Sequence, residues 1–67
     1  MTAAQFELLE PASAEELLRA RFEALADWGC PLGDALLIAS HVEVDIVDAV
    51  HLLDRGCPPD LVLSAIA

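Results

Sequence analysis

The chain has 67 residues, 57% of them hydrophobic, and its 12 acidic and 3 basic side chains give a formal charge of −9. This length allows one domain with a small core, and the apolar content excludes a disordered acidic tail. The negative charge argues against nucleic acid and anionic lipid as partners, and no apolar run is long enough to cross a membrane. We therefore expect one small globular domain with no nucleic-acid or membrane partner.

Residues 1–12 predict an arm at the start of the chain. Phe6, Leu8 and Leu9 precede Pro11, and their spacing fits neither a strand nor a helix clearly. We expect an arm that packs or docks, followed by a single helical domain over residues 13–67.

The first helix of that domain is predicted to run from Ser13 to Trp28. Ser13 and Glu16 have the spacing of a capping box, in which each side chain satisfies a backbone donor at the helix start. Gly29 follows, as is typical of the left-handed position after a helix end.

Two further helices follow short breaks in the pattern. One runs from Pro31 or Gly33 to Ser40 and is apolar on nearly all sides, which is typical of a buried central helix. The next begins after Asp45, a residue type favoured as an N-cap, and stops at Gly56. It carries the cleanest amphipathic stripe in the chain.

A fourth short helix is expected from Pro58 or Pro59, because proline is tolerated in the first turn of a helix. Together these elements predict an all-α fold, a compact bundle of four short helices. The inward-facing positions predict a core of Leu18, Phe22, Leu25, Leu36, Ala39, Ile46, Ala49, Val50 and Leu53.

The cysteines and histidines do not form a recognisable metal motif. Cys30, His41, His51 and Cys57 are suitable ligand types, but their spacings of 11, 10 and 6 residues match no compact zinc site. With no secretory leader visible, we expect a cytoplasmic protein with two free thiols. A disulfide or a redox role is the alternative.

No pattern in the sequence predicts catalysis. Glu43, Asp45 and Asp48 cluster near a helix start, where helix capping accounts for them. The serines lie in no nucleophile motif, and the glycines are too sparse for a phosphate-binding loop. We therefore expect no enzyme activity and no cofactor.

Trp28 has two interpretations. As the only tryptophan, it would supply bulk to a core that has few aromatic residues, and this interpretation is favoured. As an exposed side chain at a helix end, it would be a candidate binding hot spot.

The middle of the chain carries a family resemblance. Trp28 and Gly29 close one helix, and Ala35 follows six residues after the glycine. The later helix has a Val-x-x-Ala-Val-x-x-Leu type of pattern at Ile46, Ala49, Val50 and Leu53. Over roughly residues 17–55 the chain resembles the ubiquitin-associated (UBA-like) three-helix family. The segment VDIVDAVHLLDRGCPPDLVL also resembles short helical proteins of actinobacteria.

This resemblance implies a UBA-like three-helix core with an additional C-terminal helix. Members that bind ubiquitin usually have Phe or Tyr where this chain has Cys30, and a second Leu where it has Asp54. The resemblance therefore implies the fold and a protein-binding role more than it implies ubiquitin as the ligand.

The sequence as a whole favours a non-catalytic protein–protein interaction module, a small acidic adaptor. Its candidate contact surface consists of Trp28, Gly29, Cys30, Val47, His51 and Leu52. The alternatives are a structural homo-oligomer or a small accessory subunit of a larger complex, with a metal-binding or enzymatic protein ranked last. A homodimer would use apolar side chains at the two ends of the chain: Phe6, Leu8, Leu9, Leu61, Val62 and Ile66.

Overall fold

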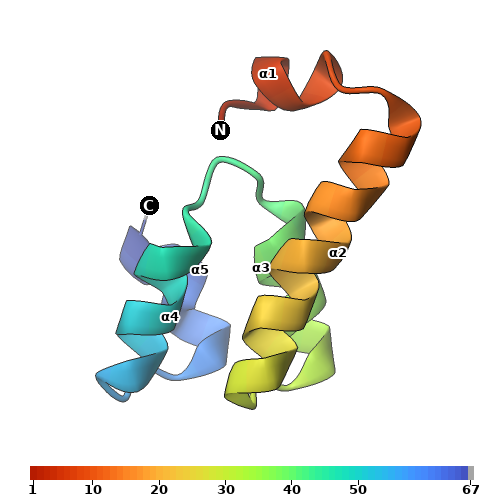
Figure 1. Ribbon diagram of the computed structural model, residues 1–67. Coiled ribbons are helices and arrows are strands. Elements are labelled where there is room, and N and C mark those ends of the chain that lie inside the picture. Colours follow the sequence, from red (N-terminus) through yellow and green to blue (C-terminus); the bar gives the residue numbers. More distant parts are fainter. Residues whose placement is uncertain (67) are drawn as a thin grey trace.

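A computed structural model describes residues 1–66, and all regular structure in that range is helical. The elements are α1 (Ala3–Glu7), α2 (Pro11–Trp28), α3 (Leu32–Ser40), α4 (Ile46–Asp54), a 3-10 turn η1 (Pro59–Leu61) and α5 (Val62–Ile66). The expected all-α fold is confirmed, with one short helix more than expected because part of the arm is helical (Figure 1). Among these residues, no helix combines the length and apolar character needed to span a bilayer.

The additional helix, α1, starts with a capping box formed by Thr2 and Gln5, whereas the sequence predicted a capping box at Ser13 and Glu16. The Thr2 hydroxyl accepts a hydrogen bond from the Gln5 backbone N–H at 3.1 Å, and the Gln5 side chain accepts one from the Thr2 N–H at 2.9 Å. This reciprocal pair satisfies two donors at a helix start. The helix contributes no fully buried residue and turns back from the start of α2 across one end of the molecule (Figure 1).

The predicted capping box at Ser13 is wrong. The helix α2 begins at Pro11, with Glu10 at the N-cap and no side-chain hydrogen bond there. The fixed φ of proline suits the first helical position and its missing N–H costs nothing there, so Ser13 lies inside the first turn. The predicted end is confirmed, because Gly29 adopts a left-handed conformation with φ of 106°.

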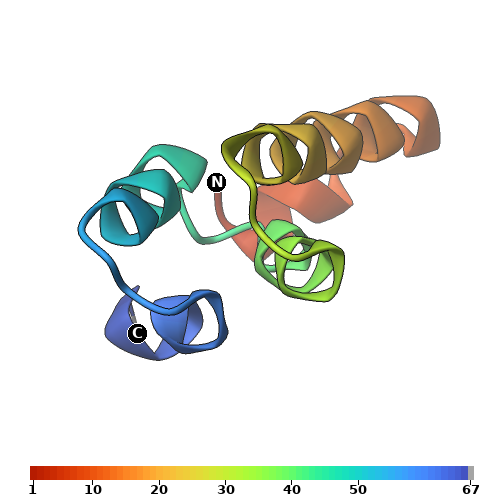
Figure 2. The same ribbon diagram turned by 90° about the horizontal axis from the view of Figure 1, so that it is seen from below.

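The helix α2 is the longest element, and the rest of the bundle is arranged around its second half (Figures 1 and 2). It packs against α3 and α4, while α5 packs against α4 and the turn η1 contacts α3. Arg21 of α2 also reaches the end of α3, where its Nε donates to the Ala39 carbonyl at 3.0 Å and its Nη2 to the His41 carbonyl at 2.7 Å. The guanidinium thus lies at the C-terminal end of α3, where a positive charge is favourable.

The core contains about half of the predicted residues. Leu25, Ala39, Ala49 and Leu53 are buried as expected. Four others are half-buried: Leu18, Phe22, Ile46 and Val50. The remaining core positions are Cys30, Ala35, Ile38, Val42, Val44 and Val62. Val62 has no exposed surface, so the start of α5 completes a core that three helices alone leave open.

The prediction that the second helix is buried on all sides is wrong. The helix α3 buries only the face formed by Ala35, Ile38 and Ala39. Leu36, expected in the core, is 61% exposed. A bundle of this size covers a nine-residue helix from one side only, so apolar residues on its other side remain in contact with water.

Candidate functional site

Trp28 lies at the surface, where it joins the ends of α2 and α4. Its side chain is 41% exposed, and its Nε1–H donates a 2.6 Å hydrogen bond to Oδ1 of Asp54. The favoured interpretation of Trp28 as a core anchor is therefore wrong. The indole does not fill the core, because a partner for its polar N–H is available at the end of α4.

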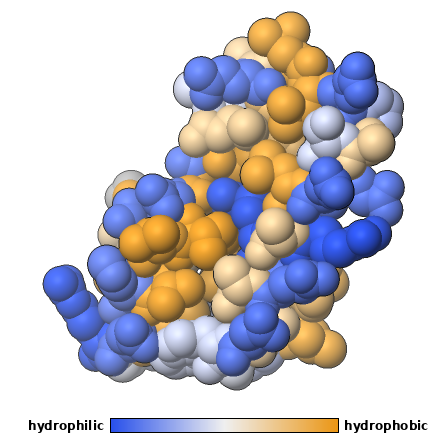
Figure 3. Space-filling view, in the orientation of Figure 1, coloured by the Kyte–Doolittle hydropathy of each residue, from blue (hydrophilic) through white to orange (hydrophobic). Residues whose placement is uncertain are grey.

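The outward face of α4 continues from this contact. Val47, His51 and Asp54 recur at i, i+4 and i+7, so they share one side of the helix, and Val47 is 59% exposed. His51 is also exposed. We call Trp28, Val47, His51 and Asp54 the Trp28 face. In the space-filling view, apolar side chains gather over α4 (Figure 3).

Two residues of the predicted contact surface are less exposed than expected. Cys30 is only 4% exposed and lies in the core, because the chain turns inward after the left-handed Gly29. Leu52 is half-buried and packs against the core. Trp28, Gly29, Val47 and His51 are exposed. The structure adds Asp54, which was not among the predicted residues and which is hydrogen-bonded to Trp28.

The two cysteines differ in their surroundings. Both are free thiols in the described structure. Burial raises the pKa of the Cys30 thiol above its ordinary value, and the nearby Asp34 carboxylate raises it further. A thiol held in its protonated form is a poor nucleophile and a poor metal ligand. Cys57 is half-buried, with its Sγ 3.6 Å from the Pro58 carbonyl oxygen.

One hollow lies between the loop that follows α3 and the helix α5. It has a volume of about 620 Å³ and is lined by His41, Glu43, Val44, Leu63, Ser64 and Ile66. The His41 Nδ1 lies 3.0 Å from Glu43 Oε1. A hydrogen bond from the backbone N–H of Glu43 lowers the pKa of its carboxyl group below the ordinary value, and the hydrogen bond with His41 lowers it further.

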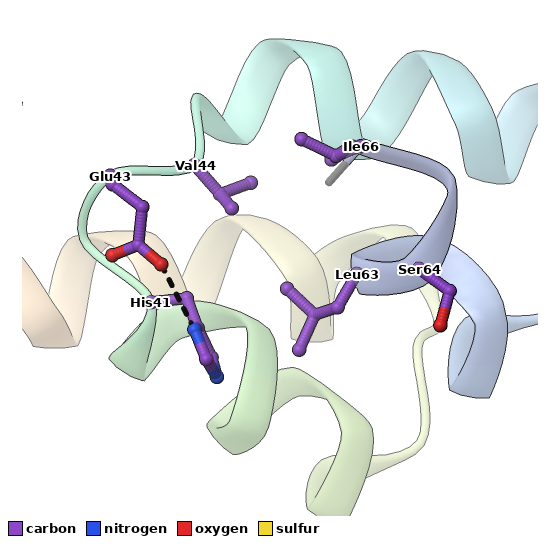
Figure 4. Close-up of a pocket in the computed structure, with 6 residues that line it drawn as sticks. All are labelled: His41, Glu43, Val44, Leu63, Ser64 and Ile66. Atoms are coloured by element: carbon purple, nitrogen blue, oxygen red, sulfur yellow. Dashed lines mark hydrogen bonds and ion pairs between the residues drawn. The ribbon is translucent and has the colours of Figure 1, made fainter.

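The histidine, carboxylate and serine in this hollow do not form a catalytic chain. Leu63 projects between His41 and Ser64, and the Ser64 hydroxyl points away from the imidazole (Figure 4). A nucleophile must lie within hydrogen-bonding reach of its base, and no hydrogen bond joins these two side chains in residues 1–66. Within the same range, no three His, Cys, Asp or Glu side chains converge in a way that could hold a metal ion.

A second, smaller hollow lies between α4 and α5. Its volume is about 380 Å³, and its walls are Asp48, His51, Leu52, Arg55, Ala65 and Ile66. Its lining combines polar or charged side chains with apolar ones. His51 therefore belongs to the Trp28 face and also lines this hollow.

Sequence reasoning missed the exposed leucines of α3. Leu32, Leu36 and Leu37 are 63%, 61% and 53% exposed. The signal was present in the sequence, because a short helix in a small bundle cannot bury every side when all of its sides are apolar.

Comparison of the chain with protein families, with curated proteins and with solved structures finds no match. A functional proposal for this chain therefore rests on its sequence and its geometry.

Proposed function

We propose that the chain is a non-catalytic protein–protein interaction module and that the Trp28 face is its contact surface. The observation that carries the proposal is the position of Trp28, the single tryptophan, which is 41% exposed at the surface. Tryptophan is enriched among the residues that dominate binding energies at protein interfaces. If Trp28 served mainly to fill the hydrophobic core, its side chain would be buried.

The geometry around Trp28 supports a preformed site. The hydrogen bond to Asp54 restrains the indole before a partner arrives, so less conformational entropy is lost on binding. Val47 adds an exposed apolar side chain on the same side of α4. His51 and Asp54 supply polar groups, as the rim of an interface requires.

The resemblance to the UBA-like family supports the same surface, since it involves the turn after α2 and the helix α4. The structure also gives a reason to leave ubiquitin out of the proposal. Cys30, where ubiquitin-binding members usually have an aromatic residue, is buried. Asp54, which replaces a leucine, is hydrogen-bonded to Trp28. We therefore propose a protein partner other than ubiquitin.

The test compares three baits purified from cells of the source organism after brief crosslinking: the wild type, Val47→Asp and Leu8→Asp. Each substitution puts a carboxylate in place of an exposed apolar side chain, and Leu8 is 86% exposed on the distant arm. We expect the same protein to be crosslinked to the wild type and to Leu8→Asp, and to be lost with Val47→Asp. Retention by Val47→Asp with loss by Leu8→Asp would contradict the proposal.

A homo-oligomer is the second candidate, because Leu8 is 86% and Leu61 is 50% exposed. The expected interface must be revised, however. Val62 is wrong as an interface residue, since it is fully buried in the chain's own core. Ile66 packs against that core, and Phe6 and Leu9 are half-buried.

Sedimentation equilibrium distinguishes this candidate. A subunit that associates through Leu8 and Leu61 would form a dimer that Leu61→Asp dissociates. The interaction module proposed above predicts a monomer for both the wild type and this variant.

A further inference from the structure

The outer side of α3 is an apolar surface separate from the Trp28 face. Leu32 and Leu36 are one helical turn apart, and Leu37 lies beside Leu36; each is more than half exposed. Ala35, Ile38 and Ala39 of the same helix are buried instead. We call Leu32, Leu36 and Leu37 the α3 leucine face.

The charge of the molecule restricts what can cover this face. The formal charge is −9, and two of the three arginines are engaged within the chain. Arg19 pairs with Glu15 at 3.2 Å, and Arg21 is turned to the Ala39 and His41 carbonyl groups. Only Arg55 has no such partner in residues 1–66. The surface therefore has a strong excess of unpaired negative charge.

Acidic side chains also occur on the helix that borders α3. The contact of Arg21 with the Ala39 carbonyl, together with the short turn after Trp28, places the second half of α2 alongside α3. That part of α2 carries the exposed Glu23 and Asp27. A second copy of the chain would bring like charges together, whereas a basic partner would be attracted and oriented by them.

The shape of the face fits a helix. A helix of nine residues is roughly 13 Å long. Leu32 and Leu36, four residues apart, form a short ridge of the kind that packs against another helix, and Leu37 widens the apolar surface next to it. Amphipathic helices dock on apolar surfaces through side chains of the same spacing. We propose that the α3 leucine face binds the apolar side of a cationic amphipathic helix from a partner protein.

The probe for this proposal is a fluorescein-labelled peptide of about 14 residues, roughly four helical turns, with leucines on one side and lysines on the other. Fluorescence anisotropy measures its affinity for the full chain. The test variant is Leu36→Ser, with Leu37→Ser as a second variant and Leu8→Ser as the matched control on the arm. Circular dichroism checks that each variant keeps the helix content of the wild type.

We expect the wild type and Leu8→Ser to bind the peptide equally. Leu36→Ser and Leu37→Ser should each weaken binding roughly tenfold, as the loss of one well-buried apolar contact does. A peptide with glutamate in place of lysine should bind at least about tenfold more weakly than the lysine peptide.

Two results would overturn the proposal. Equal binding by Leu36→Ser, Leu37→Ser and the wild type would mean that charge alone attracts the peptide. A wild-type dimer in sedimentation equilibrium that Leu36→Ser dissociates would mean that a second copy covers the face. Because all variants keep the Trp28 face intact, either result leaves the function proposed for that face unaffected.

Discussion

The indole N–H of Trp28 donates a 2.6 Å hydrogen bond to the carboxylate of Asp54, and this contact joins the ends of two helices that are 26 residues apart in the sequence. The hydrogen bond thereby restrains the indole of Trp28 at the surface of the protein. The contact links the stability of the fold to the geometry of the proposed binding site.

Asp54→Ala should remove this link. A hydrogen bond that involves a carboxylate at an exposed position contributes about 1 kcal/mol, so the free energy of unfolding should fall by about that amount in urea denaturation. The emission of Trp28 should change as well, because the indole loses its restraint. Asp27→Ala is the control, since this exposed carboxylate makes no side-chain hydrogen bond or ion pair within residues 1–66. An unchanged emission spectrum in Asp54→Ala would contradict the contact.

Arg21→Met should destabilise the bundle more strongly. The substitution keeps the apolar stem but removes two hydrogen bonds to the end of α3, and a hydrogen bond to a charged group is worth about 2 kcal/mol. Arg21 is half-buried, and this burial lowers the pKa of its guanidinium below the ordinary value. The free energy of unfolding should therefore fall by about 2 to 4 kcal/mol.

The control for Arg21 is Arg19→Met on the same helix. Arg19 makes only an exposed ion pair with Glu15, and such pairs contribute about 0.5 kcal/mol or less. Equal effects of the two substitutions would show that Arg21 does not hold the end of α3.

The two cysteines should react at different rates with a thiol reagent. Cys30 is 4% exposed, and burial and Asp34 raise its pKa, so in the folded protein it should react much more slowly than Cys57. After unfolding without a reductant, both thiols should react. Mass spectrometry after timed alkylation measures each site. Equal rates in the folded state would place Cys30 outside the core.

The carboxyl group of Glu43 should titrate below the ordinary range for glutamate, because its own backbone N–H and then His41 stabilise the charged form. A pKa that is lower in the folded than in the unfolded chain stabilises the fold above the unfolded value, and this stabilisation is lost as the pH falls through the folded value. Carbon-13 NMR of the side-chain carboxyl groups measures the titration. A midpoint at or above the ordinary glutamate value would be inconsistent with these hydrogen bonds.

Local signals in the sequence were sufficient for the fold class and for most helix ends. Gly29 ends α2 because a left-handed residue is needed there, and Asp45 caps α4 through the Val47 N–H as its residue type predicts. The start of α2 was misplaced because two start signals overlapped, and the proline at Pro11 prevailed over Ser13. Which of two neighbouring start signals begins a helix depends on the backbone conformation, and the residue types alone do not specify that conformation.

The surface could be predicted only in part. Val47 and His51 were identified because they lie off the apolar stripe of α4. Leu36 was placed in the core because periodicity cannot choose a buried side in a helix that is apolar all round. The contacts made by Trp28 and Arg21 join distant parts of the chain, and spacing along one helix carries no information about them.

Fluorine NMR of Trp28 can show whether a partner protein contacts the Trp28 face. Because the chain has a single tryptophan, labelling with 5-fluorotryptophan gives one resonance that reports on position 28. Titration with the partner captured in the crosslinking experiment should shift or broaden this resonance until it saturates, and Val47→Asp should abolish the change. A partner that binds while the Trp28 resonance stays unchanged would contradict the claim.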